Sequence, residues 1–402
     1  MSGAPSPRHP PALTSDLIAP ALIAWQRESG RSHLPWQATR DPYRVWLSEV
    51  MLQQTQVGTV LGYYERFLAR FPDVTALGQA ALDDVLALWS GLGYYSRARN
   101  MHLCAQAVIT QHGGEFPRSA VQLETLPGIG RSTAAAIASF CFGERVAILD
   151  GNVKRVLGRV LAFGDDLASS AAERKLWTQA QALLPDDGAD MSAYTQGLMD
   201  LGATLCLQRA PACPRCPLSQ VCRALAEGAP LAYPVKTRKT KRSQRENWWL
   251  WLQAGDAVWL EQRPTPGVWA GLWTLPLFDD AQSLLAAVDR LPSDSGSPSR
   301  HDRAISLRVS DMRDADRHGA DLRVAEPDPP RHLAPELEPL ADVKHVLTHF
   351  DWLLHPRRLR LPDSAVATPA PGGRIGRWVR RADLIDVALP APLRKLLDTS
   401  AG

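Results

Sequence analysis

Apolar residues recur at steps of three and four positions through the first half of the chain. The spacing is regular in Val60, Tyr64, Phe67 and Phe71, and similar runs continue as far as residue 225. This period places apolar side chains on one face of a helix, which can then be buried against other helices. Residues 15–225 are therefore predicted to form a mainly α-helical domain.

The pattern changes beyond residue 226. Residues 226–246 begin with Pro and Gly and then carry six Lys and Arg residues between positions 236 and 245 with no acidic residue among them, which is typical of an exposed basic linker. Aromatic and branched runs bounded by turn residues predict short strands at 248–252, 257–260, 343–347 and 352–354. With a closing helix predicted at 391–397, residues 247–398 are expected to form an α+β domain.

Two stretches lack apolar periodicity, and both are predicted to be disordered: an N-terminus at 1–14 and an insertion at 292–336. No apolar run reaches the roughly 20 residues that a membrane span needs, and the first residues lack the apolar core of a signal peptide. We therefore expect a cytoplasmic protein without membrane contact.

The cysteines are too few for a disulfide scaffold in a chain of 402 residues, because there are only six of them. Four of them form the pattern Cys206-x6-Cys213-x2-Cys216-x5-Cys222, which predicts one closed metal or cluster site. The spacing alone favours zinc over an iron–sulfur cluster. The net charge of +3 is too small to indicate a nucleic-acid partner by itself.

Two motifs stand about twenty positions apart in the helical half. In Leu126-Pro-Gly-Ile-Gly-Arg131, Gly128 and Gly130 would let backbone N–H groups approach a phosphate at the start of a helix, although such turns are often only structural. In Leu149-Asp-Gly-Asn-Val-Lys-Arg155, Asp150 precedes a predicted helix. Asp at that place is often only a helix cap, so the pattern leaves its role open.

A third motif runs from Trp46 to Gln56 and places Glu49 within an apolar helix. A lone Glu on such a helix is usually an exposed residue, so the pattern alone favours no catalytic role. Tyr94 follows in Leu92-Gly-Tyr-Tyr-Ser96, and the pattern alone allows its ring simply to pack on Trp89.

Together these motifs resemble those of the adenine DNA glycosylases of the MutY family, which are helix-hairpin-helix, iron–sulfur proteins. The resemblance covers residues 15–290 and 340–397 and implies one [4Fe-4S] cluster held by the four cysteines. It implies that Glu49 protonates the departing adenine and that Asp150 stabilises an oxocarbenium-like state. Ser132 occupies the place of the nucleophilic Lys of endonuclease III, and a hydroxyl forms no Schiff base, so a monofunctional enzyme is expected.

The resemblance also implies the partner, which is double-stranded DNA with adenine opposite 8-oxoguanine or guanine, bound by a monomer. Through this DNA the protein would be associated with the nucleoid. Such an enzyme must extrude the base and fill the gap with side chains. The residues expected to contact DNA or the substrate are Gln53, Gln54, Tyr94, Gly128, Gly130, Ser132, Asn152, Gln196, Thr348 and His349.

The C-terminal part resembles the Nudix-like domain of the same family through Glu261-Gln-Arg-Pro264 and the run that follows it. It lacks the Glu-rich helix that holds magnesium, so pyrophosphate hydrolysis is not expected. The family's Phe-Ser-His run, which reads 8-oxoguanine, is Leu347-Thr348-His349 here. Thr348 keeps a hydroxyl, but the aromatic ring is absent.

Three alternatives remain beside this interpretation. An endonuclease III-like glycosylase and lyase would carry Lys in place of Ser132 and end soon after Cys222, although Lys154 offers another amine in the chain. A non-enzymatic DNA-binding module would keep the hairpin and the cluster without the chemistry. A Nudix hydrolase would need the missing metal-binding helix.

Overall fold

The structure is a computed structural model that describes residues 13–237, 242–291, 337–367 and 375–399. The two stretches predicted to be disordered, 1–14 and 292–336, lie outside the described residues except for Leu13 and Thr14. Contacts between Cα atoms divide the chain into two compact units. The first contains Met1–Arg242, Arg263–Trp273 and Ile385–Gly402, and the second contains Ser243–Gln262 and Thr274–Leu384.

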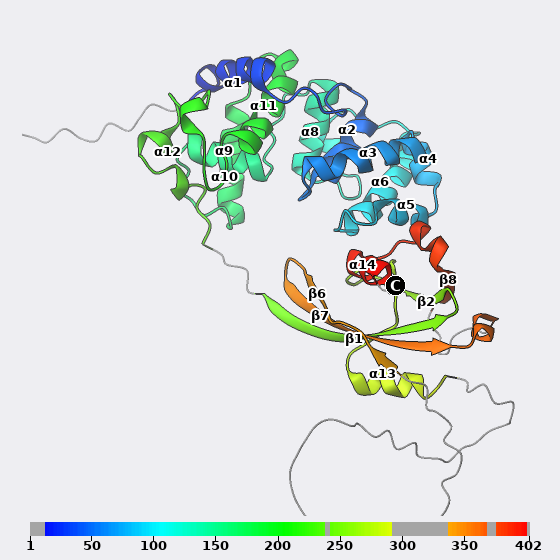
Figure 1. The fold of residues 1–402 in the computed structure, drawn as a ribbon. Helices are drawn as coiled ribbons and strands as arrows, with labels where there is room; N and C mark the ends of the chain where they lie inside the picture. Colours follow the sequence, from blue (N-terminus) through cyan, green and yellow to red (C-terminus); the bar gives the residue numbers. More distant parts are fainter. Residues whose placement is uncertain (1–12, 238–241, 292–336, 368–374, 400–402) are drawn as a thin grey trace, which may run out of the picture. The chain divides into compact units, whose positions relative to one another are not determined.

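The first unit is helical, as the apolar period predicts. One group of helices follows the middle of its sequence: α2 (Pro42–Leu52), α3 (Val57–Arg70), α4 (Val74–Gln79), α5 (Leu82–Trp89), α6 (Ser96–His112), α7 (Ala120–Leu123) and α8 (Arg131–Phe142). The other group comes from both sides of it: α1 (Ser15–Ser29), α9 (Gly151–Val160), α10 (Ser170–Ala182), α11 (Met191–Thr204) and α12 (Arg223–Ala226). α11 contacts both α8 and α9 and so joins the two groups (Figure 1).

Each helical group has its own buried core. In the first group, Phe67 of α3 packs edge-on against Trp89 of α5, with ring centroids 5.7 Å apart, and both side chains are fully buried. In the second group, residues of α1, α9, α10 and α11 form a continuous apolar cluster that includes Val156 and Leu201. The short 3₁₀ helices η1 (Gly188–Asp190), η2 (Cys213–Arg215) and η3 (Pro230–Ala232) lie in the connections.

The second unit is built on one mixed sheet, in which five strands follow the order β3-β2-β1-β7-β5, while β4 pairs with β1, β6 with β7 and β8 with β2. Its strands are β1 (Ser243–Ala254), β2 (Ala257–Gln262), β3 (Trp273–Thr274), β4 (Leu277–Phe278), β5 (Leu337–Pro339), β6 (Val343–Val346), β7 (Phe350–Leu361) and β8 (Gly376–Arg380). β1 and β7 pair in parallel over their full length, from Ser243 opposite Phe350 to Ala254 opposite Leu361. Besides α13 (Ala281–Val288), two 3₁₀ helices, η4 (Asp363–Ala367) and η5 (Arg381–Asp386), adjoin these strands in sequence.

Two expectations differ from the structure. β1 already begins at Ser243, so the end of the predicted linker at 226–246 is a strand. Residues 263–273 and α14 (Ala391–Thr399), which the sequence places with the C-terminal domain, belong to the helical unit. There the Arg99 guanidinium donates to the Ala270 carbonyl at 2.7 Å, and the Tyr95 hydroxyl donates to the Leu389 carbonyl at 3.0 Å. These long-range contacts leave no trace in local periodicity.

Among the described residues, no helix is both long enough and apolar enough to cross a membrane.

Candidate active site

A cavity of about 1020 Å³ opens in the helical unit between its two groups of helices. The end of α1, α2, the start of α8, the start of α9 and α11 all contribute to its wall. Six of the residues that the sequence predicts as site residues line this one cavity: Glu49, Gln53, Ser132, Asp150, Asn152 and Gln196. The fold thus brings together residues from four separate segments of the chain.

Glu49 lies on α2, which begins with Asp41 as its cap and Pro42 in its first turn. Its neighbours Trp46, Leu47 and Met51 are fully buried, so the helix is fixed in the core while the Glu49 carboxyl faces the cavity. Burial removes water from this carboxyl and, together with the negative charge of Asp150, raises the pKa of Glu49 to about 7. A carboxyl with this pKa can donate a proton near neutral pH.

Asp150 is the N-cap of α9, as the sequence suggests. Its Oδ1 accepts a hydrogen bond from the Val153 backbone N–H at 2.7 Å. Burial raises the pKa of Asp150 above its usual range, and the N–H groups of Val153 and Asn152 limit the rise. The cap therefore holds a carboxyl at a fixed point of the cavity wall, so the structural and catalytic interpretations are compatible.

Ser132 lies in the first turn of α8, and its Oγ accepts a hydrogen bond from the Leu149 backbone N–H at 3.3 Å. This contact places the hydroxyl beside the residue that precedes Asp150. Gly128, in the turn before α8, has a φ of +76°, and a Cβ there would lie 2.6 Å from the Asn100 Cβ, so only glycine fits. Gly130 caps α8 with open space around it.

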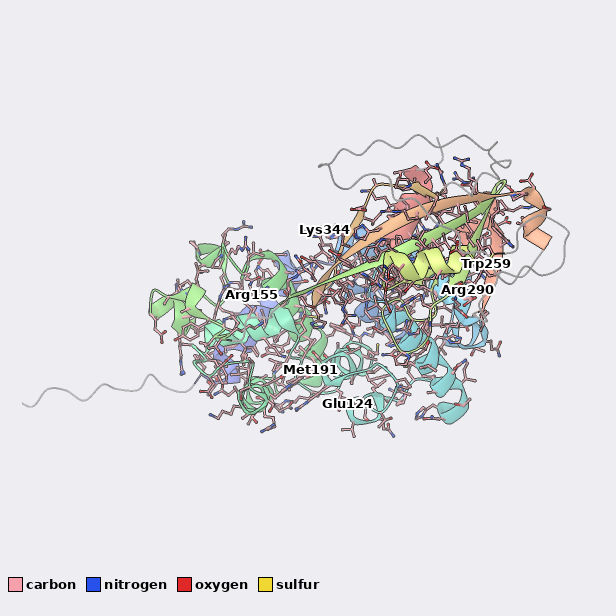
Figure 2. All side chains as sticks on the ribbon, turned by 90° about the horizontal axis from the view of Figure 1, so that it is seen from below. Glu124, Arg155, Met191, Trp259, Arg290 and Lys344 are labelled. Carbon is pink, nitrogen blue, oxygen red and sulfur yellow. The ribbon has the colours of Figure 1, made fainter. Side chains whose placement is uncertain are left out.

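Two neighbours of Asp150 on α9 are held by charged partners. The Lys154 ammonium pairs with the Glu173 carboxylate at 2.6 Å, which occupies the amine that could otherwise act as a nucleophile. Asn152 Oδ1 accepts from the guanidinium of Arg155, which also donates to the Cys206 carbonyl at 2.7 Å. Arg155 is labelled in Figure 2. Arg155 thus ties the start of α9 to the cysteine loop.

Gln196 lies on the cavity wall, one helical turn from Asp200 on α11. Its amide nitrogen donates to Asp200 Oδ1 at 2.9 Å. Asp200 is completely buried, and Arg31 donates to both of its oxygens, through its side chain at 2.6 Å and its backbone N–H at 2.9 Å. The sequence analysis missed Arg31 and Asp200. The i, i+4 spacing of Gln196 and Asp200 is the one available signal, and it does not reveal the distant Arg31.

Gln54 and Tyr94, expected to contact DNA, both adopt left-handed backbone conformations, with φ of 56° and 48°. This conformation is unusual for residues other than glycine and has to be held by surrounding contacts. The Tyr94 side chain is 46% exposed.

Arg97, at the start of α6, provides such contacts. Its guanidinium donates to the carbonyls of Val50, Met51 and Gln53 at 2.7 to 2.9 Å, and to that of Gly93 at 3.2 Å. It also lies over the Tyr94 ring, 5.5 Å from its centroid. Arg97 therefore joins the end of α2 to the Tyr94 turn. The sequence shows it only as one Arg among several.

The four cysteines of the predicted cluster site line one small cavity together with apolar residues of α9 and α11. Arg159 is buried there and donates to Cys206 Sγ at 3.3 Å and to the Leu207 carbonyl at 2.7 Å. Within the described part of the chain, no three His, Cys, Asp or Glu side chains form a group that could hold one metal ion.

Thr348 and His349 form the exposed turn between β6 and β7 in the second unit. The Leu347 N–H donates to the Phe350 carbonyl at 3.0 Å and closes this turn. These two residues do not line the cavity of the helical unit.

Comparisons with known proteins show which protein family the chain belongs to. A family model described as HhH-GPD superfamily base excision DNA repair protein matches residues 47–181, and a NUDIX domain model matches residues 247–399. The adenine DNA glycosylase of Buchnera aphidicola subsp. Acyrthosiphon pisum is 37% identical over 273 residues, which are 68% of this chain and 77% of that protein. The chain belongs to the adenine DNA glycosylase family.

The human adenine DNA glycosylase extends the match to the C-terminal part, with 32% identity over 436 aligned positions that cover 95% of this chain and 73% of that protein. The expected family, fold class and enzyme class, a DNA glycosylase of base excision repair, are therefore confirmed. DNA is the partner that follows from this membership.

Proposed function

We propose that this member of the adenine DNA glycosylase family hydrolyses the bond between adenine and deoxyribose in duplex DNA, with Glu49 and Asp150 as its catalytic residues. The observation that carries the proposal is that both carboxyl groups line one cavity, where burial raises the pKa of Glu49 to about 7. Breaking an N-glycosidic bond needs an acid for the leaving base and a negative charge for the sugar. The two carboxyls provide these roles.

In the proposed reaction, Glu49 donates its proton to a ring nitrogen of adenine as the bond between that base and the sugar breaks. The bonding electrons leave with the neutral base, and positive charge develops on the deoxyribose. The Asp150 carboxylate, held by the Val153 N–H, stabilises that charge. Water then adds to the sugar carbon and releases a proton, which leaves an abasic site and regenerates the enzyme.

The reaction stops at base release, because Ser132 presents a hydroxyl beside Asp150 rather than an amine. Lys154, the other candidate amine, is paired with Glu173. Both features support a monofunctional enzyme.

The pH dependence follows from the two carboxyl groups. Glu49 must be protonated, so the single-turnover rate is expected to fall about tenfold per pH unit once the pH rises above the Glu49 pKa of about 7. Asp150 must be ionised, and because its pKa is also raised, the rate falls on the acid side at a higher pH than for an ordinary Asp. Rates measured between about pH 5 and pH 9 test this. A rate that stays constant up to pH 9 would contradict the role of Glu49.

The base opposite adenine is proposed to be 8-oxoguanine or guanine. Gln53, Gln54 and Tyr94 fill the space left by the extruded adenine, while Thr348 and His349 contact the opposite base. The exposure of Tyr94 and of the turn at 348–349 supports these roles. The test is single-turnover adenine release from duplexes with 8-oxoguanine, guanine, cytosine or thymine opposite adenine. Equal rates on all four would contradict the proposed preference.

Arg97 offers a further prediction, because it holds the main chain on both sides of the inserted residues. Arg97→Gln is expected to slow adenine release from an 8-oxoguanine duplex by about tenfold, since several charge-assisted hydrogen bonds are lost. Arg66→Gln is the matched control, because it removes the same charge from an exposed side chain that lies over the Tyr63 ring, 4.4 Å from its centroid. If the two variants behave alike, Arg97 does not position the inserted residues.

The four cysteines are proposed to hold one [4Fe-4S] cluster, which stabilises the loop that Arg155 and Arg159 connect to α9. The residues fit such a group, because four thiols surround one apolar cavity and a buried guanidinium balances their negative charge.

The cluster proposal predicts a yellow-brown protein with about four iron atoms and four acid-labile sulfides per chain. Cys216→Ser is expected to lower the iron content and the thermal stability, whereas Cys141→Ser, outside the loop, should change neither. A colourless wild-type protein that contains zinc would overturn the proposal.

A further inference from the structure

The amide of Gln196 has a fixed orientation. Asp200 Oδ1 lies 2.9 Å from the Gln196 amide nitrogen and 2.6 Å from Arg31 Nε. A carboxylate oxygen that is paired with a guanidinium can only accept hydrogen bonds, so it must face the NH₂ group of the amide and not its carbonyl. The reversed amide would bring two oxygens together in a buried place.

This orientation decides which polar atom Gln196 offers to the cavity. Because the NH₂ group is engaged by Asp200, the carbonyl oxygen is the amide atom left for a ligand, and Gln196 lies on the cavity wall. A carbonyl oxygen accepts a hydrogen bond from an amino group and repels another carbonyl. Adenine carries an amino group on its six-membered ring where hypoxanthine and guanine carry an oxygen.

We propose that Asp200 is a positioning residue that fixes the Gln196 amide and thereby selects a base with an amino group over one with an oxygen at the same position. The inference rests on the proposed function, because it assigns the cavity to the excised base. Arg31 is also needed for this orientation. A completely buried carboxylate requires a compensating charge, and the Arg31 guanidinium provides that charge to Asp200, while Arg31 as a whole donates two hydrogen bonds to it.

Asp200→Asn tests the proposal, because an asparagine amide can donate as well as accept and so no longer dictates the orientation of Gln196. The measured quantity is the ratio of single-turnover rates for adenine and hypoxanthine, each opposite 8-oxoguanine. Comparing this ratio between variants cancels the intrinsic difference between the two leaving groups. Asp200→Asn is expected to lower the ratio about tenfold, which is the effect of one hydrogen bond that discriminates between the bases.

A merely structural role for Asp200 makes a different prediction. If Asp200 only stabilises the fold, Asp200→Asn lowers the melting temperature and both rates together, and the ratio stays at its wild-type value, which would overturn the inference. In a Gln196→Met background, which has no amide to orient, Asp200→Asn should leave the ratio unchanged. A drop in the ratio in that background would equally overturn it.

Asp190→Asn is the matched control. Asp190 also pairs with an arginine, Arg27, at 2.7 Å, but it is not part of the cavity wall. Asp190→Asn should leave the ratio of the adenine and hypoxanthine rates at the wild-type value. Wild-type protein that releases neither base would refute the proposed function itself and the inference with it, whereas adenine release with an unchanged ratio in Asp200→Asn refutes only the inference.

Discussion

Asp150→Asn is expected to lower the single-turnover rate of adenine release by about a thousandfold or more, because the charge that stabilises the oxocarbenium-like sugar is lost. Asparagine has nearly the same shape and can still accept the hydrogen bond that Val153 donates to the cap at 2.7 Å. The variant therefore separates the two roles of this residue. The melting temperature should stay close to that of the wild type while the rate falls.

Asp73→Asn is the matched control, since Asp73 caps α4 with a 2.7 Å hydrogen bond from Ala76, is exposed and does not line the cavity. It should change neither quantity by much. If Asp150→Asn keeps a rate within about tenfold of the wild type, Asp150 is only a helix cap, and the charge it contributes does little for the reaction.

The second large effect is expected for Glu49→Gln, which removes the proton donor while keeping the size of the side chain. The rate should fall by about a hundredfold to ten-thousandfold near neutral pH, and the remaining activity should lose its decline above about pH 7. Glu65→Gln, an exposed change on α3, is the matched control.

The same variant should be more stable than the wild type in mildly alkaline solution. The pKa of Glu49 rises from 4.5 to about 7 on folding, so the folded protein binds more protons than the unfolded chain between these values, and its stability falls as the pH rises through that window. Gln does not ionise. Allowing for the partial exposure of Glu49, we expect Glu49→Gln to raise the free energy of unfolding at about pH 8 by up to about 2 kcal/mol. If Glu49→Gln instead lowers the free energy of unfolding at this pH, burial does not disfavour the ionised carboxyl of Glu49.

Local pattern predicts much of this fold. The three- and four-residue period predicts the face of α3 that buries Val60, Tyr64 and Phe67, and the position of Asp150 before α9 predicts its cap. Strand positions are predicted as well, but not their extent: β7 spans twelve residues where the sequence suggests three. The missing part comes from its parallel pairing with β1, a long-range contact that local propensity does not register.

The candidate site likewise contains residues that the sequence predicts and residues that it does not. Glu49 is distinguished from an ordinary helical Glu only by the resemblance of its whole motif, because the burial that raises its pKa depends on the packing of distant helices. Arg31 and Asp200 are 169 positions apart, so no local pattern predicts that they pair. Arg97 likewise donates to main-chain carbonyls more than forty positions away. Because every residue has a main-chain carbonyl, residue types cannot reveal such contacts.

The most direct test of the central claim is the product of one turnover on a duplex with adenine opposite 8-oxoguanine. Full-length protein is mixed in excess with the duplex, free base is identified by chromatography, and the strand is examined before and after alkali. The proposed mechanism predicts free adenine, an intact strand before alkali and a break at the adenine position after it. Breaks that form without alkali would contradict the monofunctional role inferred from Ser132, and failure to release adenine would contradict the assignment of Glu49 and Asp150.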